Sequence, residues 1–211
     1  MTRQAGRKVL VVGAGGHAKV VVATLRAAGW EIAGVLDDDT GKKGSVLLGA
    51  PVLGSPADHL PSSGLPAVIA IGDNAARRAV AERFRGATWC AVVHPTAHVE
   101  PSVSLGPGAV VFAGAVIQPD AHLGAHVIVN TGATIDHDCA IGDFAHVAPG
   151  VHLSGGATIG EGVLLGIGCC VKPGASVGAW ATVGAGAAVV RDVPEGAVAL
   201  GVPAAAPTNR D

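Results

Sequence analysis

Large aromatic side chains are scarce in this sequence of 211 residues, which has no tyrosine, three phenylalanines and three tryptophans. A core without large rings has to be built from valine, alanine, leucine and isoleucine, which favours a regular stack of small layers over an irregular interior. The 32 glycines alone would suggest disorder, but 49% hydrophobic and 14% charged residues indicate a folded chain.

An excess of positive charge is also missing, since the formal net charge is −2, and we expect no nucleic-acid partner. The charge is unevenly distributed along the chain. Residues 1–92 hold 11 Lys and Arg against 7 Asp and Glu, whereas residues 93–211 hold 3 against 9. The first part is therefore the better host for an anionic ligand.

Cysteine is limited to Cys90, Cys139, Cys169 and Cys170, which form neither a CxxC motif nor a zinc-ligand spacing. Reduced thiols in a cytoplasmic protein are the simplest interpretation. The apolar run near the N-terminus is too short for a signal peptide, and no stretch is long enough to span a membrane. We expect a cytoplasmic protein without a membrane span.

A six-residue repeat dominates the second part of the chain. From Val93 onward every sixth residue is aliphatic through seventeen consecutive hexads, and the fifth position of each hexad is Ala, Val or Cys. The aliphatic positions are Val93, Val99, Leu105, Val111, Ile117, Leu123, Val129, Ile135, Ile141, Val147, Leu153, Ile159, Leu165, Val171, Val177, Val183 and Val189.

A period of six fits neither a helix nor a flat strand, but it matches a parallel β-helix in which each hexad is one short strand and one turn. The aliphatic residue then fills the interior, and the small residue lies at the tight corner. Cys139 and Cys169 occupy that small position, so we interpret them as compact apolar fillers. Glycine is frequent at the second or fourth position, where we expect turns that need a positive φ.

The first part of the chain has a different pattern, which predicts a small parallel α/β domain over residues 1–92. Residues 93–211 then form the β-helix with a C-terminal tail. The elements expected in the α/β domain alternate between strand and helix. The expected strands are 8–12, a second strand that ends at residue 36, 68–71 and 88–93. The expected helices are 18–28 and 77–84.

A glycine loop, Gly13-Ala14-Gly15-Gly16-His17, lies between the first strand and the first helix. Such a loop lets backbone N–H groups approach a phosphate at the N-terminus of a helix. Asp37 follows about twenty residues later, where an acidic residue can accept a hydrogen bond from a ribose hydroxyl. A purely structural tight turn is the alternative. The short domain suits one nucleotide diphosphate better than a dinucleotide.

The hexads resemble the hexapeptide-repeat family, whose fold is a left-handed parallel β-helix and whose members are mostly trimeric acyltransferases that use acetyl-CoA. The segments GAGGHAKV, AIGDN and HPTAHV and the ending GVPA narrow the resemblance. Together they resemble the sialic acid O-acetyltransferase and bacillosamine N-acetyltransferase family, with a lean toward GDP-perosamine N-acetyltransferases. The resemblance implies a homotrimer in which the α/β domain holds a nucleotide sugar and the β-helix holds acetyl-CoA.

The segment 130–139, NTGATIDHDC, resembles the catalytic segment of that family and carries over site residues. His137 is implied to be the general base, and Asp138 its acidic partner in place of the glutamate of many relatives. The implied acetyl-CoA contacts are His146, Gly155, Ile167 and Ala185. The implied nucleotide-sugar contacts are Gly13, Gly15, Gly16, His17, Asp37, Asp73 and Asn74.

The expected reaction is direct attack of a sugar amine on acetyl-CoA, with a histidine accepting the proton. O-acetylation of sialic acid or another sugar is the nearest alternative, and a non-catalytic nucleotide-binding trimeric scaffold is an alternative of another class. One branch of the hexapeptide-repeat family binds zinc through three histidines, but its spacing is not found, and we expect no metal. We expect four of the other histidines, His94, His98, His122 and His126, at surface turns or at the trimer interface.

Overall fold

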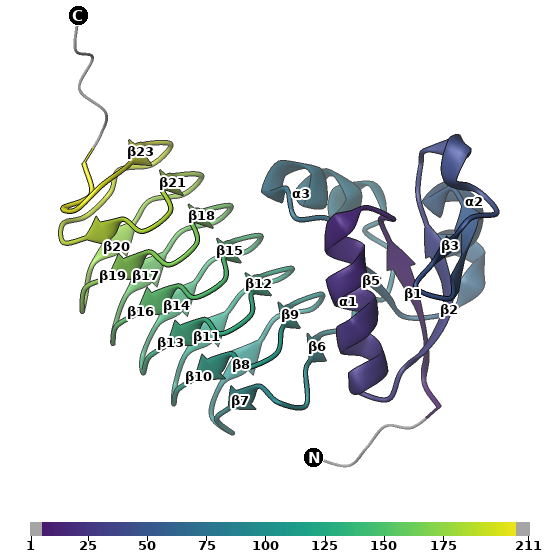
Figure 1. Cartoon of the computed structure of the whole chain (residues 1–211), viewed down its shortest axis with the longest axis horizontal. Coiled ribbons are helices and arrows are strands. Elements are labelled where there is room, and N and C mark those ends of the chain that lie inside the picture. The colour runs from purple at the N-terminus through teal and green to yellow at the C-terminus, as the bar shows by residue number, and fades with distance from the viewer. Residues whose placement is uncertain (1–5, 206–211) are drawn as a thin grey trace, which may run out of the picture.

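The computed structural model describes residues 6–205, which form an α/β domain packed against the first coils of a left-handed parallel β-helix (Figure 1). The expected fold class is therefore confirmed. Residues 206–211, part of the expected C-terminal tail, lie outside the described residues. No helix within residues 6–205 is long and apolar enough to cross a membrane.

The α/β domain is built on a five-stranded sheet of order β3-β4-β2-β1-β5, parallel except for the β3–β4 pair. Its β-branched strand β1 lies in the interior of the sheet, and three helices cover the faces. The strands are β1 (Lys8–Val12), β2 (Glu31–Leu36), β3 (Val46–Leu47), β4 (Ala50–Gly54) and β5 (Ala67–Ile69). The helices are α1 (Gly16–Ala27), α2 (Pro56–Ser63), α3 (Asn74–Arg83) and the 3₁₀ turn η1 (Thr40–Lys42).

The sequence pattern located most of these elements and missed two features. The β3–β4 hairpin and α2 have no periodic signal, because β3 has two residues and α2 contains Pro61. The strand expected over 88–93 is wrong as one element. Trp89 makes only an isolated bridge to Ala67, and pairing resumes at β6 (Val92–Val93).

Every one of the seventeen hexads supplies a two-residue strand whose second residue is the aliphatic one. Each strand from β6 to β19 pairs with the strand eighteen residues further on, so three hexads make one coil and three parallel sheets form; in the last coil β21 pairs with β23, sixteen residues on. Most of the aliphatic and small positions are fully buried in one continuous core, Cys139 and Cys169 among them.

The strands are grouped by the sheet to which they belong. The seven-stranded sheet holds β6 (Val92–Val93), β9 (Val110–Val111), β12 (Ile128–Val129), β15 (His146–Val147), β18 (Leu164–Leu165), β21 (Thr182–Val183) and β23 (Val198–Ala199). The six-stranded sheet holds β7 (His98–Val99), β10 (Val116–Ile117), β13 (Thr134–Ile135), β16 (His152–Leu153), β19 (Cys170–Val171) and β22 (Ala188–Val189). The five-stranded sheet holds β8 (Ser104–Leu105), β11 (His122–Leu123), β14 (Ala140–Ile141), β17 (Thr158–Ile159) and β20 (Ser176–Val177).

Glycines in the hexads serve two different purposes, and the sequence-based explanation holds for only one. At the fourth position the backbone is left-handed, as in Gly132 with φ 67° and Gly150 with φ 65°. At the second position φ is not positive. There a Cβ would collide with the backbone of the next coil, as at Gly142, where it would come 2.5 Å from Glu161 N. Close approach of coils therefore requires those glycines.

Helix α1 is a shared layer between the two parts of the molecule. Its buried residues pack on the α/β sheet and also against Val110, Phe112 and Ile128 of the seven-stranded face, within one hydrophobic cluster. Figure 1 shows α1 standing between the sheet and the coils that carry β6 and β9. The two parts therefore share a continuous core, which fixes their relative position.

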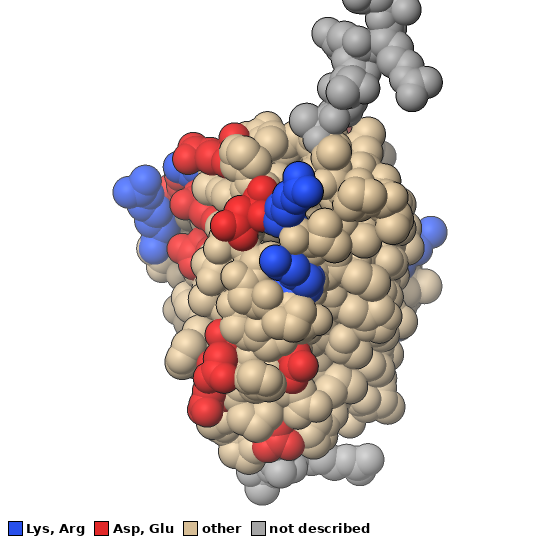
Figure 2. Space-filling model, turned by 90° about the vertical axis from the view of Figure 1, so that its left-hand side faces the viewer, with Lys and Arg blue, Asp and Glu red and all other residues tan. Residues whose placement is uncertain are grey.

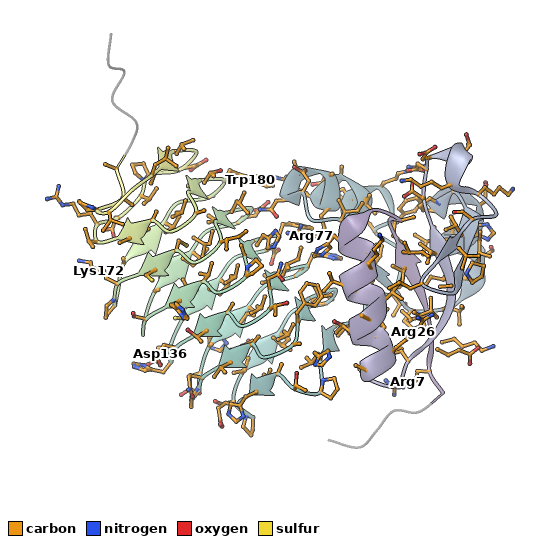
Figure 3. All side chains as sticks on the ribbon, viewed as in Figure 1. Arg7, Arg26, Arg77, Asp136, Lys172 and Trp180 are labelled. Carbon is orange, nitrogen blue, oxygen red and sulfur yellow. The ribbon has the colours of Figure 1, made fainter. Side chains whose placement is uncertain are left out.

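Helix α3 adds a polar clamp to this packed layer. Arg77 is 1% exposed, and its five N–H groups donate to Ile71 O, Gly72 O, His126 O, Phe144 O and Asn74 Oδ1 at 2.7–3.2 Å. Burial lowers the pKa of Arg77 to about 10, so the side chain remains charged at neutral pH. Figure 3 shows Arg77 between α3 and the coils.

The β-helix meets this clamp at the corner between its five-stranded and seven-stranded sheets. His126 lies there at φ 55° with its ring stacked on Phe144 at 5.2 Å and edge-on to Trp89 at 5.3 Å. The expectation that His126 lies at a surface turn or trimer interface is wrong, because the ring is 4% exposed between the two parts of its own chain. Desolvation, together with nearby Arg77, lowers its pKa to about 4.

Candidate functional site

His137 lies on the corner between the six-stranded and five-stranded sheets, which we call the His137 corner (turn residues 100–102, 118–120, 136–138, 154–156, 172–174 and 190–192). Its ring is exposed, and Nδ1 lies 2.7 Å from Asp138 Oδ2. Asp136 Oδ1 accepts from the backbone N–H of His137 at 2.8 Å. Asp138 adopts φ 59°, a conformation that Asp tolerates better than most residues.

The carboxylate beside Nδ1 sets the chemistry of the imidazole. The hydrogen bond to Asp138 and the charge of Asp136 raise the pKa of His137. In the neutral ring, a proton on Nδ1 is held by Asp138, which leaves the lone pair on Nε2 as the basic site. Asp138 in place of Glu is therefore long enough to orient the ring.

Gly155 lies one coil further on, directly beside this basic nitrogen. A Cβ at Gly155 would come within 2.6 Å of His137 Nε2 and Cε1, so any larger residue would displace the ring. The Gly155 N–H has no hydrogen-bond acceptor among residues 6–205, whereas the neighbouring Gly156 N–H donates to His137 O at 2.9 Å. A basic nitrogen and a free backbone donor thus lie next to each other.

A cavity of about 370 Å³ opens at the carboxyl ends of β1, β2 and β5 in the α/β domain. Gly13 adopts φ 108°, and a Cβ there would lie 3.0 Å from Ala70 O, so the loop needs glycine at that position. Most of the predicted nucleotide contacts line the cavity together. Its lining is Val12, Gly13, Ala14, Gly15, Gly16, His17, Leu36, Asp37, Asp38, Lys42, Pro56, Ala70, Ile71, Gly72 and Val80.

Asp37 organises the wall of this cavity. Its carboxylate accepts from Ala14 N–H at 2.7 Å, Asp39 N–H at 2.9 Å and Lys42 Nζ at 3.0 Å. Partial burial raises the pKa of Asp37, but these hydrogen bonds more than offset it, and the pKa is lowered overall. Lys42 was missed in the sequence, although it is a basic residue shortly after the predicted acidic position.

His17 and His146 come together where the cavity meets the β-helix. Their rings lie 6.1 Å apart, and the His17 ring also contacts Phe112 at 5.4 Å. His146 Nδ1 lies 3.3 Å from Gly72 O, and its Nε2 lies 3.2 Å from Asn130 Nδ2. Burial, together with the charge of Arg77, lowers the pKa of both histidines to about 4, so they are neutral at physiological pH.

Asp73 and Asn74 lie at the start of α3 and not in the lining of the cavity. Asp73 Oδ1 caps the helix by accepting from Ala76 N–H at 2.8 Å. Asn74 Nδ2 donates to Gly162 O and Val163 O at 3.0 and 3.1 Å, and Arg77 donates to its Oδ1. The amide of Asn74 is therefore occupied between the two parts of the chain.

The predicted acetyl-CoA contacts are distributed around the β-helix. Gly155 shares the His137 corner, and His146 lies on the seven-stranded face toward the α/β domain. Ile167, whose side chain is 62% exposed, and Ala185 lie on the third corner, between the seven-stranded and six-stranded sheets. One chain alone does not bring these four residues together.

The cavity and His137 are also separated within a chain. The α/β domain packs against the seven-stranded face, while His137 lies on the corner that does not border that face. Figure 3 places Asp136, the neighbour of His137, at the edge of the β-helix farthest from the α/β domain. No cluster of three or more His, Cys, Asp or Glu side chains suited to a metal ion is found in the part of the chain that the structure describes.

Comparison with known proteins identifies relatives over nearly the whole chain. Residues 8–84 match the PglD N-terminal domain family. The structure of PerB from Caulobacter crescentus, in complex with CoA and GDP-perosamine, is 42% identical and covers 97% of this chain and 99% of that chain, with a TM-score of 0.90. The acetyltransferase domain of PglB from Neisseria gonorrhoeae FA1090, in complex with acetyl coenzyme A, is 41% identical over 95% of this chain and 98% of that chain, with a TM-score of 0.88.

A curated relative, the uncharacterized protein L142 of Acanthamoeba polyphaga mimivirus, is 34% identical over 103 residues. The match covers 49% of this chain and 21% of L142, so it spans about a fifth of that relative's length. The full-length matches carry more weight, and they confirm the resemblance read from the hexads and the catalytic segment. The chain belongs to the sialic acid O-acetyltransferase and bacillosamine N-acetyltransferase family of hexapeptide-repeat sugar acyltransferases, together with PerB and the PglB acetyltransferase domain.

Proposed function

We propose that this protein is an acetyl-CoA-dependent N-acetyltransferase acting on a nucleotide-linked amino sugar. The observation that carries the proposal is the arrangement at the His137 corner. Asp138 holds Nδ1, and the basic Nε2 lies beside the free N–H of Gly155. The 42% identity to PerB, whose structure holds CoA and GDP-perosamine, favours a GDP-linked amino sugar as the first substrate to test.

The reaction needs a base, an oxyanion donor and an oriented amine. The neutral sugar amine attacks the thioester carbon of acetyl-CoA, and His137 Nε2 accepts the proton that the nitrogen loses. The Gly155 N–H donates to the oxyanion of the tetrahedral intermediate, an interaction worth about 3 kcal/mol in comparable sites. When the intermediate collapses, the carbon–sulfur bond breaks, and the imidazolium returns its proton to the departing CoA thiolate.

The α/β cavity is proposed to hold the nucleotide diphosphate. Gly15, the N-cap of helix α1, and Gly16 and His17, its first two residues, line the cavity, where their N–H groups can donate to a phosphate, while the Ala14 N–H is already occupied by Asp37. Lys42 also lines the cavity, where its charge is paired with the carboxylate of Asp37 at 3.0 Å. We still propose Asp37 as a nucleotide contact, and its hydrogen bond with Ala14 N–H also fixes the shape of the glycine loop.

We propose a homotrimer because one chain separates the two substrate sites. The cavity opens beside the seven-stranded face, whereas His137 lies on the opposite corner. A neighbouring chain that presents its His137 corner to this cavity completes the site. Ile167 and Ala185 on the third corner are then placed to contact acetyl-CoA held by a neighbour's His137 corner. The four free cysteines fit a reducing compartment, and we propose a cytoplasmic location.

A thiol-release assay with acetyl-CoA tests the activity directly. A panel of GDP- and UDP-linked amino sugars is compared with the matching hydroxy sugars and with sialic acid. We expect CoA release and a product heavier by one acetyl group only with an amino sugar. Release with a hydroxyl acceptor alone would replace N-acetylation by O-acetylation, and binding without release would support the scaffold alternative.

A further inference from the structure

Basic residues are rare in the β-helix, and their placement is uneven. Residues 93–211 contain only Lys172, Arg191 and Arg210, of which Arg210 lies outside the described residues. Lys172 and Arg191 both lie on the His137 corner, and both are exposed. Neither makes an ion pair or a side-chain hydrogen bond within residues 6–205. Two charges are thus held in solvent on the corner that carries the proposed base.

The strand register places these charges in line with the base. The eighteen-residue repeat stacks Asp136, Ser154 and Lys172 on successive coils, and it stacks His137, Gly155, Pro173 and Arg191 in the same way. Because paired strands lie about 4.8 Å apart, Lys172 is roughly 10 Å and Arg191 roughly 14 Å along the axis from the base. Figure 3 shows Lys172 and Asp136 at the same edge of the β-helix.

The same corner changes its sign of charge at His137. On the N-terminal side and beside the base lie Glu100, Asp120, Asp136 and Asp138, while Lys172 and Arg191 lie on the C-terminal side. Figure 2, which faces this edge, shows acidic side chains alone in the lower half and basic side chains, with further acidic ones beside them, in the upper half. Asp192 is the nearest acidic residue to Arg191 in the chain, and its Oδ1 accepts from Ser176 N–H at 2.9 Å.

A shallow cavity of about 320 Å³ accompanies this column on the six-stranded face. It is lined in part by Gln118, Asp136, Ser154 and His152. Lys172 is the next residue of the column above Ser154, so its stem lies above the C-terminal end of the cavity. If an extended ligand lies in this hollow, its end nearest the C-terminal coils lies close to the unpaired charges of Lys172 and Arg191.

We propose that Lys172 and Arg191 bind the phosphate groups of acetyl-CoA and thereby set the direction in which the cofactor lies on the His137 corner. This inference rests on the proposed function. The thioester then lies at Gly155 and His137, and the phosphate-bearing end lies toward the C-terminal coils. Ammonium and guanidinium groups bind phosphate strongly. The acidic side of the corner disfavours the opposite direction, because its carboxylates would repel the phosphate groups.

The test compares acetyl-CoA with S-acetylpantetheine, which has the same thioester and no phosphate. The variants are Lys172→Gln, Arg191→Gln and the double variant, with Lys8→Gln as a matched control at the far end of β1. We expect each corner variant to raise the KM for acetyl-CoA about tenfold, because a charge-assisted hydrogen bond is lost. The kcat, the KM for the amino sugar and the turnover of S-acetylpantetheine should stay within about twofold of the unmodified protein.

An unchanged KM for acetyl-CoA in the double variant would overturn the inference. An equal loss with S-acetylpantetheine would also overturn it, because the effect would then not act through phosphate. Calorimetric titration with CoA separates the two proposals. Suppose that no sugar is acetylated, but that CoA binds and the double variant binds CoA about a hundredfold more weakly. The phosphate site is then supported although the proposed reaction is not. Equal CoA affinity in the unmodified protein and the double variant would contradict the phosphate site and leave the proposed reaction standing.

Discussion

At the scale of single residues, the proposed chemistry depends on the Nε2 atom of His137. We expect His137→Ala to lower kcat by about 10²–10⁴-fold, because a general base contributes an effect of that size. The KM values should change little, since the ring is exposed and supports no packing. Steady-state kinetics with acetyl-CoA and the accepted amino sugar measures both constants. Near-normal kcat in this variant would remove the proposed role of His137.

The pH dependence of the reaction should show how Asp138 affects the pKa of His137. The base acts in its neutral form, so activity is lost as the pH falls through the pKa of the imidazole. Because Asp138 and Asp136 raise that pKa, the acidic limb of kcat/KM should lie above pH 6.5. Asp138→Asn should move the limb to lower pH and reduce the plateau, since the carboxylate no longer holds Nδ1. A limb that stays in place would show that another group controls it.

At the scale of structural elements, the coils depend on two kinds of glycine. We expect Gly142→Ala to destabilise the protein by about 1–3 kcal/mol, because its Cβ would overlap the backbone of the next coil. Gly150→Asn should cost less than about 1 kcal/mol, because φ is 65° with open space around it, and asparagine tolerates that conformation. Urea denaturation measures both values. Equal losses in the two variants would contradict this distinction.

Helix α3 provides a second test at this scale. Arg77→Met leaves four buried or partly buried carbonyl groups and one amide without their donor, so we expect a loss of about 3 kcal/mol in the free energy of unfolding. Arg78→Met is the matched control on the same helix. Arg78 is exposed and paired with Glu82 and Glu161, so little change is expected. A stable Arg77 variant would show that the α1 packing and the remaining polar contacts hold the two parts together without this clamp.

The β-helix was predictable residue by residue, because a strict period of six has one structural solution. The α/β domain was predictable where strands and helices are long enough to show a pattern, and not at β3 or α2. The burial of His126 and the clamp of Arg77 could not be predicted, because both depend on where the α/β domain docks on the coils. Of the site, His137 and the glycine loop follow from local motifs, whereas Lys42 and the wide separation of the two substrate sites follow from the fold.

At the scale of the whole molecule, one buried histidine and two partly buried ones couple stability to pH. Desolvation and nearby Arg77 lower the pKa of His17, His126 and His146 to about 4, below the 6.5 of an exposed histidine. The unfolded chain therefore binds more protons between these values, and stability is lost as the pH falls from 6.5 toward 4. One such group is worth about 3 kcal/mol at pH 4, so the melting temperature should fall by at least roughly 6–12 °C over this range.

His126→Asn serves as the control for this pH effect. It removes one of the three titrating groups and keeps a residue that tolerates a positive φ. Its melting temperature should depend less steeply on pH than that of the unmodified protein, whatever its value at pH 7.5. Identical slopes in the two proteins would mean that other groups cause the loss of stability.

Assembly can be tested by complementation between two inactive variants. His137→Ala lacks the base, and Gly15→Trp fills the cavity at a position with open space for the side chain. If each site combines the cavity of one chain with the His137 corner of the next, every mixed trimer holds one complete site out of three and should recover about one third of full activity. Co-expression with a different tag on each variant isolates the mixed assemblies. No recovery in verified mixed trimers would place both sites in one chain.

The eighteen-residue coil also acts as a ruler along the His137 corner. Adding one whole coil between Gly155 and Lys172 would lengthen the span from base to cations by about 4.8 Å and leave every side chain pointing as before. Adding a single hexad would instead turn all later residues by one face and carry both cations off the corner. The distance from His137 to the two cations can therefore change without a change in the direction of any side chain. Insertion or deletion of whole coils can thus alter the length of acyl donor that is accepted and leave the catalytic turn unchanged.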